Sequence, residues 1–179
     1  AGAGLLAASL KRAIEISPGF LPEHLLTGHI SLIHKNYLDD PLRIRFADRV
    51  AERVGGLPGV QAVGLVSSAP VAGKAGGSDL RVVSVGGRPA GQDGPPLSPY
   101  VYGVAGDYFR AMGIPLREGR FFDVMASPRD EQACVGDEVF ARRNWPGMKA
   151  IGQQVYDGPA IEPGERPFTV IGVVGAVKQ

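Results

Sequence analysis

The spacing of hydrophobic and polar residues predicts one well-defined helix in the first third of the chain. Between residues 41 and 54 the apolar side chains fall on one stripe, and the charged side chains take the opposite face. Asp40 stands where a helix cap is expected, and Gly55-Gly56 supplies a C-terminal stop. The pattern predicts an amphipathic helix packed on a sheet. The side chains expected to meet the sheet are Leu42, Phe46 and Val50.

Strand patterns lie on both sides of this helix. Residues 24–33 alternate loosely between apolar and polar side chains, and residues 60–68 form a second strand after the turn at Pro58-Gly59. With the helix they predict a β-α-β unit, for which a right-handed crossover to a parallel partner is the default. Residues 168–177 are almost continuously apolar and β-branched, as is typical of a strand buried on both faces. We expect all three strands to share one sheet.

Shorter elements fill the rest of the chain, and together they give an α+β fold class. Asp107 and Asp137 are placed to cap two short helices. Residues 4–12 predict a helix that is uniformly apolar at its start, so this end is either buried or the tail of a membrane span. The other expected elements are strands at 80–85, 100–104 and 131–135 and helices at 108–112 and 138–145, with glycine-rich or proline-rich connectors at 69–79 and 86–99.

The composition limits what this fold can bind. The 179 residues suffice for one domain or for two small lobes. The formal net charge is +1 with both signs interspersed, so we expect no nucleic acid and no anionic lipid surface as a partner. No apolar run reaches the roughly 18–20 residues of a membrane span. The single cysteine, Cys134, leaves no internal disulfide to form.

The histidines do not have the spacing of a metal site. On a strand, His24 and His34 would share a face but lie ~33 Å apart, and His29 would point the opposite way. No cluster of cysteines or carboxylates completes a ligand set. We therefore expect surface or strand-end histidines and no metal. Acidic pairs at caps and turns, which we assign to capping more readily than to acid–base chemistry, are Asp39-Asp40 and Glu118 with Asp123.

No other group of residues forms a catalytic pattern. Cys134 lies in an apolar strand segment, which favours a buried, inert thiol over a nucleophile. The tract 73–78 looks like a phosphate loop, but Ser68 stands where its first glycine is needed and Ala75 replaces the serine or threonine. We read it as a connector. We expect no catalytic residue, no cofactor and no metal ligand, and hence no enzyme.

Five stretches of the chain together follow one known pattern. They are Ser17-Pro18-Gly19-Phe20 with Leu25-Leu26; Leu57-Pro58-Gly59-Val60; Gly106-Asp107-Tyr108-Phe109 continuing through Met112-Gly113-Ile114-Pro115-Leu116 to Gly119-Arg120-Phe121-Phe122; Asp137-Glu138 with Ala141-Arg142, Trp145-Pro146-Gly147 and Ile151-Gly152; and Phe168 to Gly175. In this order they resemble the MacB-like periplasmic core domain of bacterial MacB/FtsX-type ABC transporter permeases. Gly4-Leu5-Leu6 before Ser9-Leu10 further resembles the duplicated orphan permeases known chiefly from acidobacteria.

The resemblance implies an architecture and a role. The fold would be a porter-like β-α-β lobe, residues 17–74 and 166–179, with an inserted smaller α+β lobe, residues 75–165, after a membrane-proximal helix at 1–16. The domain would face the periplasm from the bacterial inner membrane and transmit ATP-driven conformational change for export or efflux. The implied partners are a cytoplasmic ATPase, reached through the membrane part, and a periplasmic partner or a second permease copy.

Alternatives remain open at two points. A ligand-sensing extracytoplasmic domain would bury a small molecule in an enclosed apolar pocket between the lobes. Residues 119–122 are expected to form a turn with packing aromatics, and direct partner contact by Arg120 or Trp145 is the alternative. Because Leu5, Leu6 and Leu10 have no evident partner and 168–177 is expected to present an unpaired edge, we also expect this chain to self-associate through its terminal elements.

Overall fold

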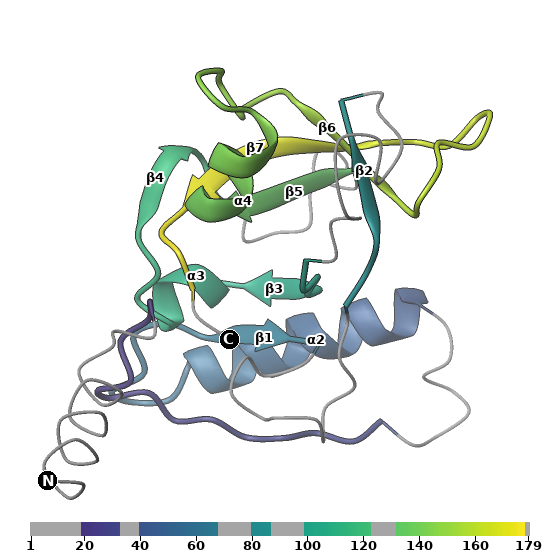
Figure 1. Cartoon of the computed structure of the whole chain (residues 1–179). Helices are drawn as coiled ribbons and strands as arrows, with labels where there is room; N and C mark the ends of the chain where they lie inside the picture. The colour runs from purple at the N-terminus through teal and green to yellow at the C-terminus, as the bar shows by residue number, and fades with distance from the viewer. Residues whose placement is uncertain (1–18, 33–39, 68–79, 87–98, 123–131, 178–179) are drawn as a thin grey trace, which may run out of the picture.

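The protein's structure, a computed structural model, describes residues 19–32, 40–67, 80–86, 99–122 and 132–177. Its elements in these ranges form two layers (Figure 1), which we call the α2 layer and the β7 sheet. The α2 layer comprises segment 19–32, α2 (Asp40–Gly55), β1 (Gly64–Val66), β3 (Val104–Gly106) and α3 (Tyr108–Ala111). The β7 sheet comprises β2 (Val83–Val85), β4 (Leu116–Gly119), β5 (Ala133–Asp137), α4 (Glu138–Asn144), β6 (Gln154–Asp157) and β7 (Phe168–Val174).

Helix α2 confirms the predicted amphipathic helix and crosses a small sheet. Its stripe of Leu42, Phe46 and Val50 is half-buried, and the helix contacts both β1 and β3. These two strands pair antiparallel, with Leu65 opposite Ala105. The stripe therefore faces the protein as predicted, but a sheet of two short strands does not bury it completely.

Strand β7 lies at the centre of the five-stranded sheet. β5 runs parallel to it along one edge, while β6 and β4 pair antiparallel with the start and the end of its other edge. β2 then pairs with β6. The buried core of this sheet comprises Val83, Val85, Trp145, Ala150, Val155, Val170 and Val173. The expectation of a strand buried on both faces is confirmed at the end of β7, where the consecutive residues Val173 and Val174 are both buried, and Val170 is the most buried side chain of the strand.

A second buried cluster joins the two layers. It comprises Phe20, Tyr108, Met112, Ile114 and Val174. These residues come from segment 19–32, from α3 and the residues after it, and from the end of β7. Because both layers contribute side chains, burial of apolar surface in this cluster stabilises their contact.

The predicted shared sheet is wrong. Residues 25–32 follow a turn at Glu23 and His24 and form no strand, and β1 pairs antiparallel with β3 instead of parallel with them. Residues 168–174 lie in the other sheet, where both edges of β7 are covered, so the expected unpaired edge is wrong as well. The alternation of apolar and polar residues predicts which side chains of a strand share a face. It does not predict which strand lies next to it, because that depends on packing in the folded chain. The lobe boundaries at 17–74, 75–165 and 166–179 stay predictions.

The two predicted short helices form, but only one is capped as expected. The Asp137 carboxylate accepts a hydrogen bond from the Phe140 amide at 2.7 Å, which satisfies a free donor at the start of α4. Asp107 precedes α3 without a side-chain capping bond, and its carboxylate lies 3.7 Å from the Arg110 guanidinium. The predicted helix at 4–12 and the tract 73–78 lie outside the described residues.

Candidate functional site: a joint between the two layers

Three segments of the chain meet where the α2 layer passes into the β7 sheet. They are residues 19–21, 112–115 and 175–176, which we call the joint. The Leu21 amide donates to the Met112 carbonyl and the Gly175 amide donates to the Pro115 carbonyl, both at 2.9 Å. Main-chain hydrogen bonds therefore tie both neighbouring segments to 112–115.

Glycines allow these segments to touch through their backbones. Gly19 has φ of +86°, and a Cβ placed there would lie 2.0 Å from the Ala176 carbonyl oxygen. Gly113 has φ of +63°, and a Cβ there would lie 2.8 Å from Cδ1 of Leu21. Left-handed backbone and closed space both exclude larger residues at these positions. The joint thus combines a close backbone contact at Gly19 with a side-chain contact of Leu21 against Gly113, and both positions require glycine.

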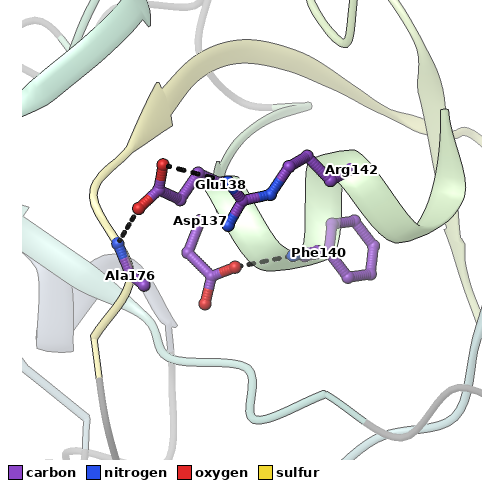
Figure 2. Close-up of polar contacts among 5 residues, drawn as sticks. All are labelled: Asp137, Glu138, Phe140, Arg142 and Ala176. Carbon is purple, nitrogen blue, oxygen red and sulfur yellow. Dashed lines mark hydrogen bonds and ion pairs between the residues drawn. The ribbon is translucent and has the colours of Figure 1, made fainter. Parts of the chain in front are cut away.

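Helix α4 places an acidic side chain on the joint, as Figure 2 shows. One carboxylate oxygen of Glu138 accepts from the Ala176 amide at 3.3 Å, and the other lies 3.8 Å from the Arg142 guanidinium. The Asp137 cap fixes the start of the helix, and with it the position of Glu138. Glu138 therefore links the helix of the β7 sheet to the chain that leaves β7 for the α2 layer.

Two open pockets that share Arg117 and Glu138 lie beside the joint, and together we call them the groove. One part has a volume of about 420 Å³ and is lined by the joint residues. The other part, about 280 Å³, lies between β4 and α4. Arg117 and Glu138 line both parts, so the groove carries charges of both signs. It is unlike the enclosed apolar pocket expected of a small-molecule sensor.

The residues considered for chemistry do not converge on this joint. His24 and His29 are exposed and His34 lies outside the described residues. Within the described ranges there is no group of three metal-ligating side chains. Burial raises the pKa of the Cys134 thiol to about 12, so it stays protonated at neutral pH and is a poor nucleophile. This agrees with the inert thiol that the sequence predicted.

Of the two residues considered as partner contacts, Trp145 is buried and Arg120 is exposed. Trp145 is 3% exposed, and its ring packs edge-to-face on Phe140 with centroids 5.7 Å apart. Arg120 is exposed, and its guanidinium donates to the Phe121 carbonyl at 3.0 Å. Phe121 stacks on Phe109 at 4.9 Å. The packing aromatics expected at 119–122 are therefore observed, whereas the expected turn is not: Gly119 ends β4 and the residues after it are irregular.

The contact made by Glu138 could not be predicted from the sequence. Asp137-Glu138 belongs to one of the five stretches described above, but the amide that Glu138 binds lies 38 residues further along the chain. A cap at Asp137 can be predicted from local spacing, whereas the contact with Ala176 depends on the end of β7 passing α4. Only the sheet topology brings these two residues together.

Comparison with known proteins identifies the class of domain. Residues 9–179 match the family model of the MacB-like periplasmic core domain. This chain therefore belongs to that family, whose members are periplasmic domains of MacB-like ABC transporter permeases. Among curated proteins none matches it. In the described residues, no helix is both long and apolar enough to cross a membrane.

Solved structures with a similar fold include the periplasmic region of MacB from Actinobacillus actinomycetemcomitans, at 22% identity and a TM-score of 0.50. Others are a domain of a putative permease from Porphyromonas gingivalis (17%, TM-score 0.43) and the extracellular domain of the noncanonic ABC-type transporter YknZ from Gram-positive bacteria (16%, TM-score 0.45). Each match covers 73% of this chain and 50%, 50% and 58% of the respective structures. The chain thus spans about half the length of the structures it matches.

Proposed function

We propose that this domain transmits movement, driven by ATP hydrolysis in the cytoplasm, to the periplasmic side of a MacB/FtsX-type permease during export or efflux. The permease would lie in the bacterial inner membrane and work with a cytoplasmic ATPase. The domain itself would catalyse no reaction. The observation that carries the proposal is the joint, where the close backbone contact of Gly19 with Ala176 and the hydrogen bond from the Gly175 amide to the Pro115 carbonyl link two separately built layers.

The joint suits such a role for a physical reason. A lever needs stiff parts and a defined place where they meet. The β7 sheet has a buried core of its own, and contacts between the layers lie in the second cluster, in the joint and where residues 80–81, before β2, pair with residues 99–100, before β3. Movement of one layer would therefore reach the other through few residues.

Distance measurements in the intact transporter test the proposal. Spin labels would be attached to exposed positions in each layer, Asp48→Cys on α2 and Arg143→Cys on α4, with Cys134→Ser as the background. We expect the distance between the labels to differ between the ATP-bound and ADP-bound transporter. A control pair within the β7 sheet, Arg143→Cys with Gln154→Cys, should keep its distance. Equal distances in both nucleotide states, in a complex that hydrolyses ATP, would contradict the proposal.

A ligand-sensing domain is the second candidate, and the groove is the observation that favours it. Arg117 and Glu138 could bind the two charges of a zwitterionic molecule. Thermal unfolding with a panel of amino acids and short peptides distinguishes the two functions. A saturable rise in Tm that Arg117→Ala abolishes would favour the sensor, and no rise would favour the lever.

A further inference from the structure

Strand β7 continues past the point where its neighbour β5 ends. The parallel ladder of the two strands closes with Asp137 opposite Val174. The next residue after β5, Glu138, starts helix α4, whereas the chain of β7 goes on through Gly175 and Ala176 toward the α2 layer (Figure 1). Helix carbonyls accept from amides four residues further along the same helix. The main-chain carbonyls of α4 are therefore used within the helix and do not extend the ladder.

The side chain of Glu138 supplies the acceptor that the ladder lacks at this point. Amides of successive residues in an extended chain point to opposite edges. The Gly175 amide donates to the Pro115 carbonyl on the β4 edge, so the Ala176 amide points to the edge where β5 has ended. There one carboxylate oxygen of Glu138 accepts from it at 3.3 Å (Figure 2). The exit of the chain from β7 is thus held on one edge by main chain and on the other by a side chain.

Ala176 also lies against the other layer. A Cβ placed on Gly19 would lie 2.0 Å from the Ala176 carbonyl oxygen, so the two backbones are in close contact. The amide of Ala176 is bound by α4 of the β7 sheet, and its carbonyl lies against the segment 19–32 of the α2 layer. A displacement of Ala176 relative to α4 would therefore displace the contact between the layers.

Of the two contacts made by Glu138, the hydrogen bond to Ala176 is the one that bears on the joint. The second carboxylate oxygen lies 3.8 Å from the Arg142 guanidinium, and the Arg142 side chain is 71% exposed. Such an exposed ion pair contributes little, whereas a half-buried amide that loses its acceptor is costly. The position therefore needs an oxygen acceptor more than it needs a negative charge.

We propose that Glu138 is a positioning residue for the joint. By accepting from the Ala176 amide it fixes the path of the chain from β7 to the α2 layer, and so sets how the two layers lie relative to each other. This positioning does not depend on the proposed function. Its consequence, that movement passes between the layers through Glu138, rests on the proposed role in transport.

Amide hydrogen exchange, followed residue by residue by NMR spectroscopy, tests the positioning on the chain itself. In Glu138→Ala we expect the Ala176 amide to exchange at least about tenfold faster, because it has lost its acceptor. Glu138→Gln keeps an oxygen acceptor and should stay within about threefold of the rate in the unmodified chain. Arg142→Ala removes only the ion pair and should also stay within about threefold. Val139→Ala, at the exposed next position of α4, is the control and should leave the rate unchanged.

The amides around Ala176 separate positioning from a general loss of stability. The amides of Val173 in β7 and Phe140 in α4 should keep their rates in Glu138→Ala, since their own hydrogen bonds are not removed. An unchanged Ala176 rate in Glu138→Ala would overturn the proposal. So would equal acceleration in Glu138→Gln and Glu138→Ala, or equal acceleration of Val173, Phe140 and Ala176.

Spin labels in the intact transporter test the consequence for movement. With labels at Asp48→Cys and Arg143→Cys in the Cys134→Ser background, Glu138→Ala should reduce the nucleotide-dependent change in distance by at least about half, and Glu138→Gln should retain it. A full change in Glu138→Ala would contradict coupling through Glu138. No change even with Glu138 in place would contradict the proposed function, and the exchange rates alone would then decide the positioning role.

Discussion

The β7 sheet and the α2 layer differ in how completely the described chain covers their strands. In the β7 sheet the central strand has neighbours on both edges, and Val170 is 1% exposed. In the α2 layer two short strands pair only with each other, the helix stripe is half-buried, and Ile44 and Leu26 are exposed. The comparison indicates that the sheet is stable through its own contacts, whereas the α2 layer depends on the joint and on contacts with other chain segments.

Of the substitutions considered, removing the largest core side chain of the β7 sheet should lower the stability of the domain most. Trp145→Ala should lower the free energy of unfolding by about 3–5 kcal/mol, because it leaves a cavity among Val83, Val155 and Val170. Urea denaturation measures the loss. Met148→Ala, three residues away and exposed, is the control and should change stability by less than about 0.5 kcal/mol. A loss below about 1 kcal/mol for Trp145→Ala would mean that the core of the β7 sheet is loose.

Substitutions in the joint should cause the next largest loss of stability. Gly19→Ala sets a methyl group against the Ala176 carbonyl and strains the backbone, so we expect a loss of about 2–4 kcal/mol. Gly59 has the same φ of +86° but open space around it. Gly59→Ala should therefore cost only the backbone strain, about 1 kcal/mol. Equal losses in thermal or urea unfolding would show that Gly19 and Ala176 are not in close contact.

Shortening a side chain of the α2 stripe should lower stability less than shortening a side chain in the core of the β7 sheet. Phe46 is half-buried, so Phe46→Ala should cost about 1–2 kcal/mol and not the 3–5 kcal/mol of a fully buried phenylalanine. Ile44→Ala on the exposed face of the same helix should be nearly neutral. If Phe46→Ala costs as much as Trp145→Ala, the α2 layer is as well packed as the sheet, and the comparison fails.

The two aspartates that precede short helices allow the smallest effect to be measured. Asp137→Ala removes a capping hydrogen bond and should destabilise the domain by about 1 kcal/mol. Asp107→Ala removes only a long ion pair and should cost less than about 0.5 kcal/mol. Chemical denaturation measures the loss of unfolding free energy in both variants. A larger loss for Asp107→Ala than for Asp137→Ala would show that α3, and not α4, depends on the aspartate before it.

Local features of this fold were predictable from sequence, and long-range ones were not. The stripe of α2, the Asp137 cap and the doubly buried 168–174 follow from spacing and residue type. The pairing of β1 with β3 does not, because many strands would satisfy the same alternation. β4 was missed because all four of its residues are exposed, and β6 because only Val155 in it is buried. The joint was missed for the same reason as the contact of Glu138 with Ala176: its parts are far apart in sequence.

Native-state hydrogen exchange tests most directly whether the two layers are separate folding units. We predict that the amides of Val170 and Val173 exchange only through global unfolding, since they lie in the centre of the β7 sheet. The amides of α2, β1 and β3 should exchange at least about tenfold faster, through opening of the α2 layer while the sheet stays folded. Exchange of both groups at one common rate, falling together with denaturant, would show a single cooperative unit and would contradict a lever built from two layers.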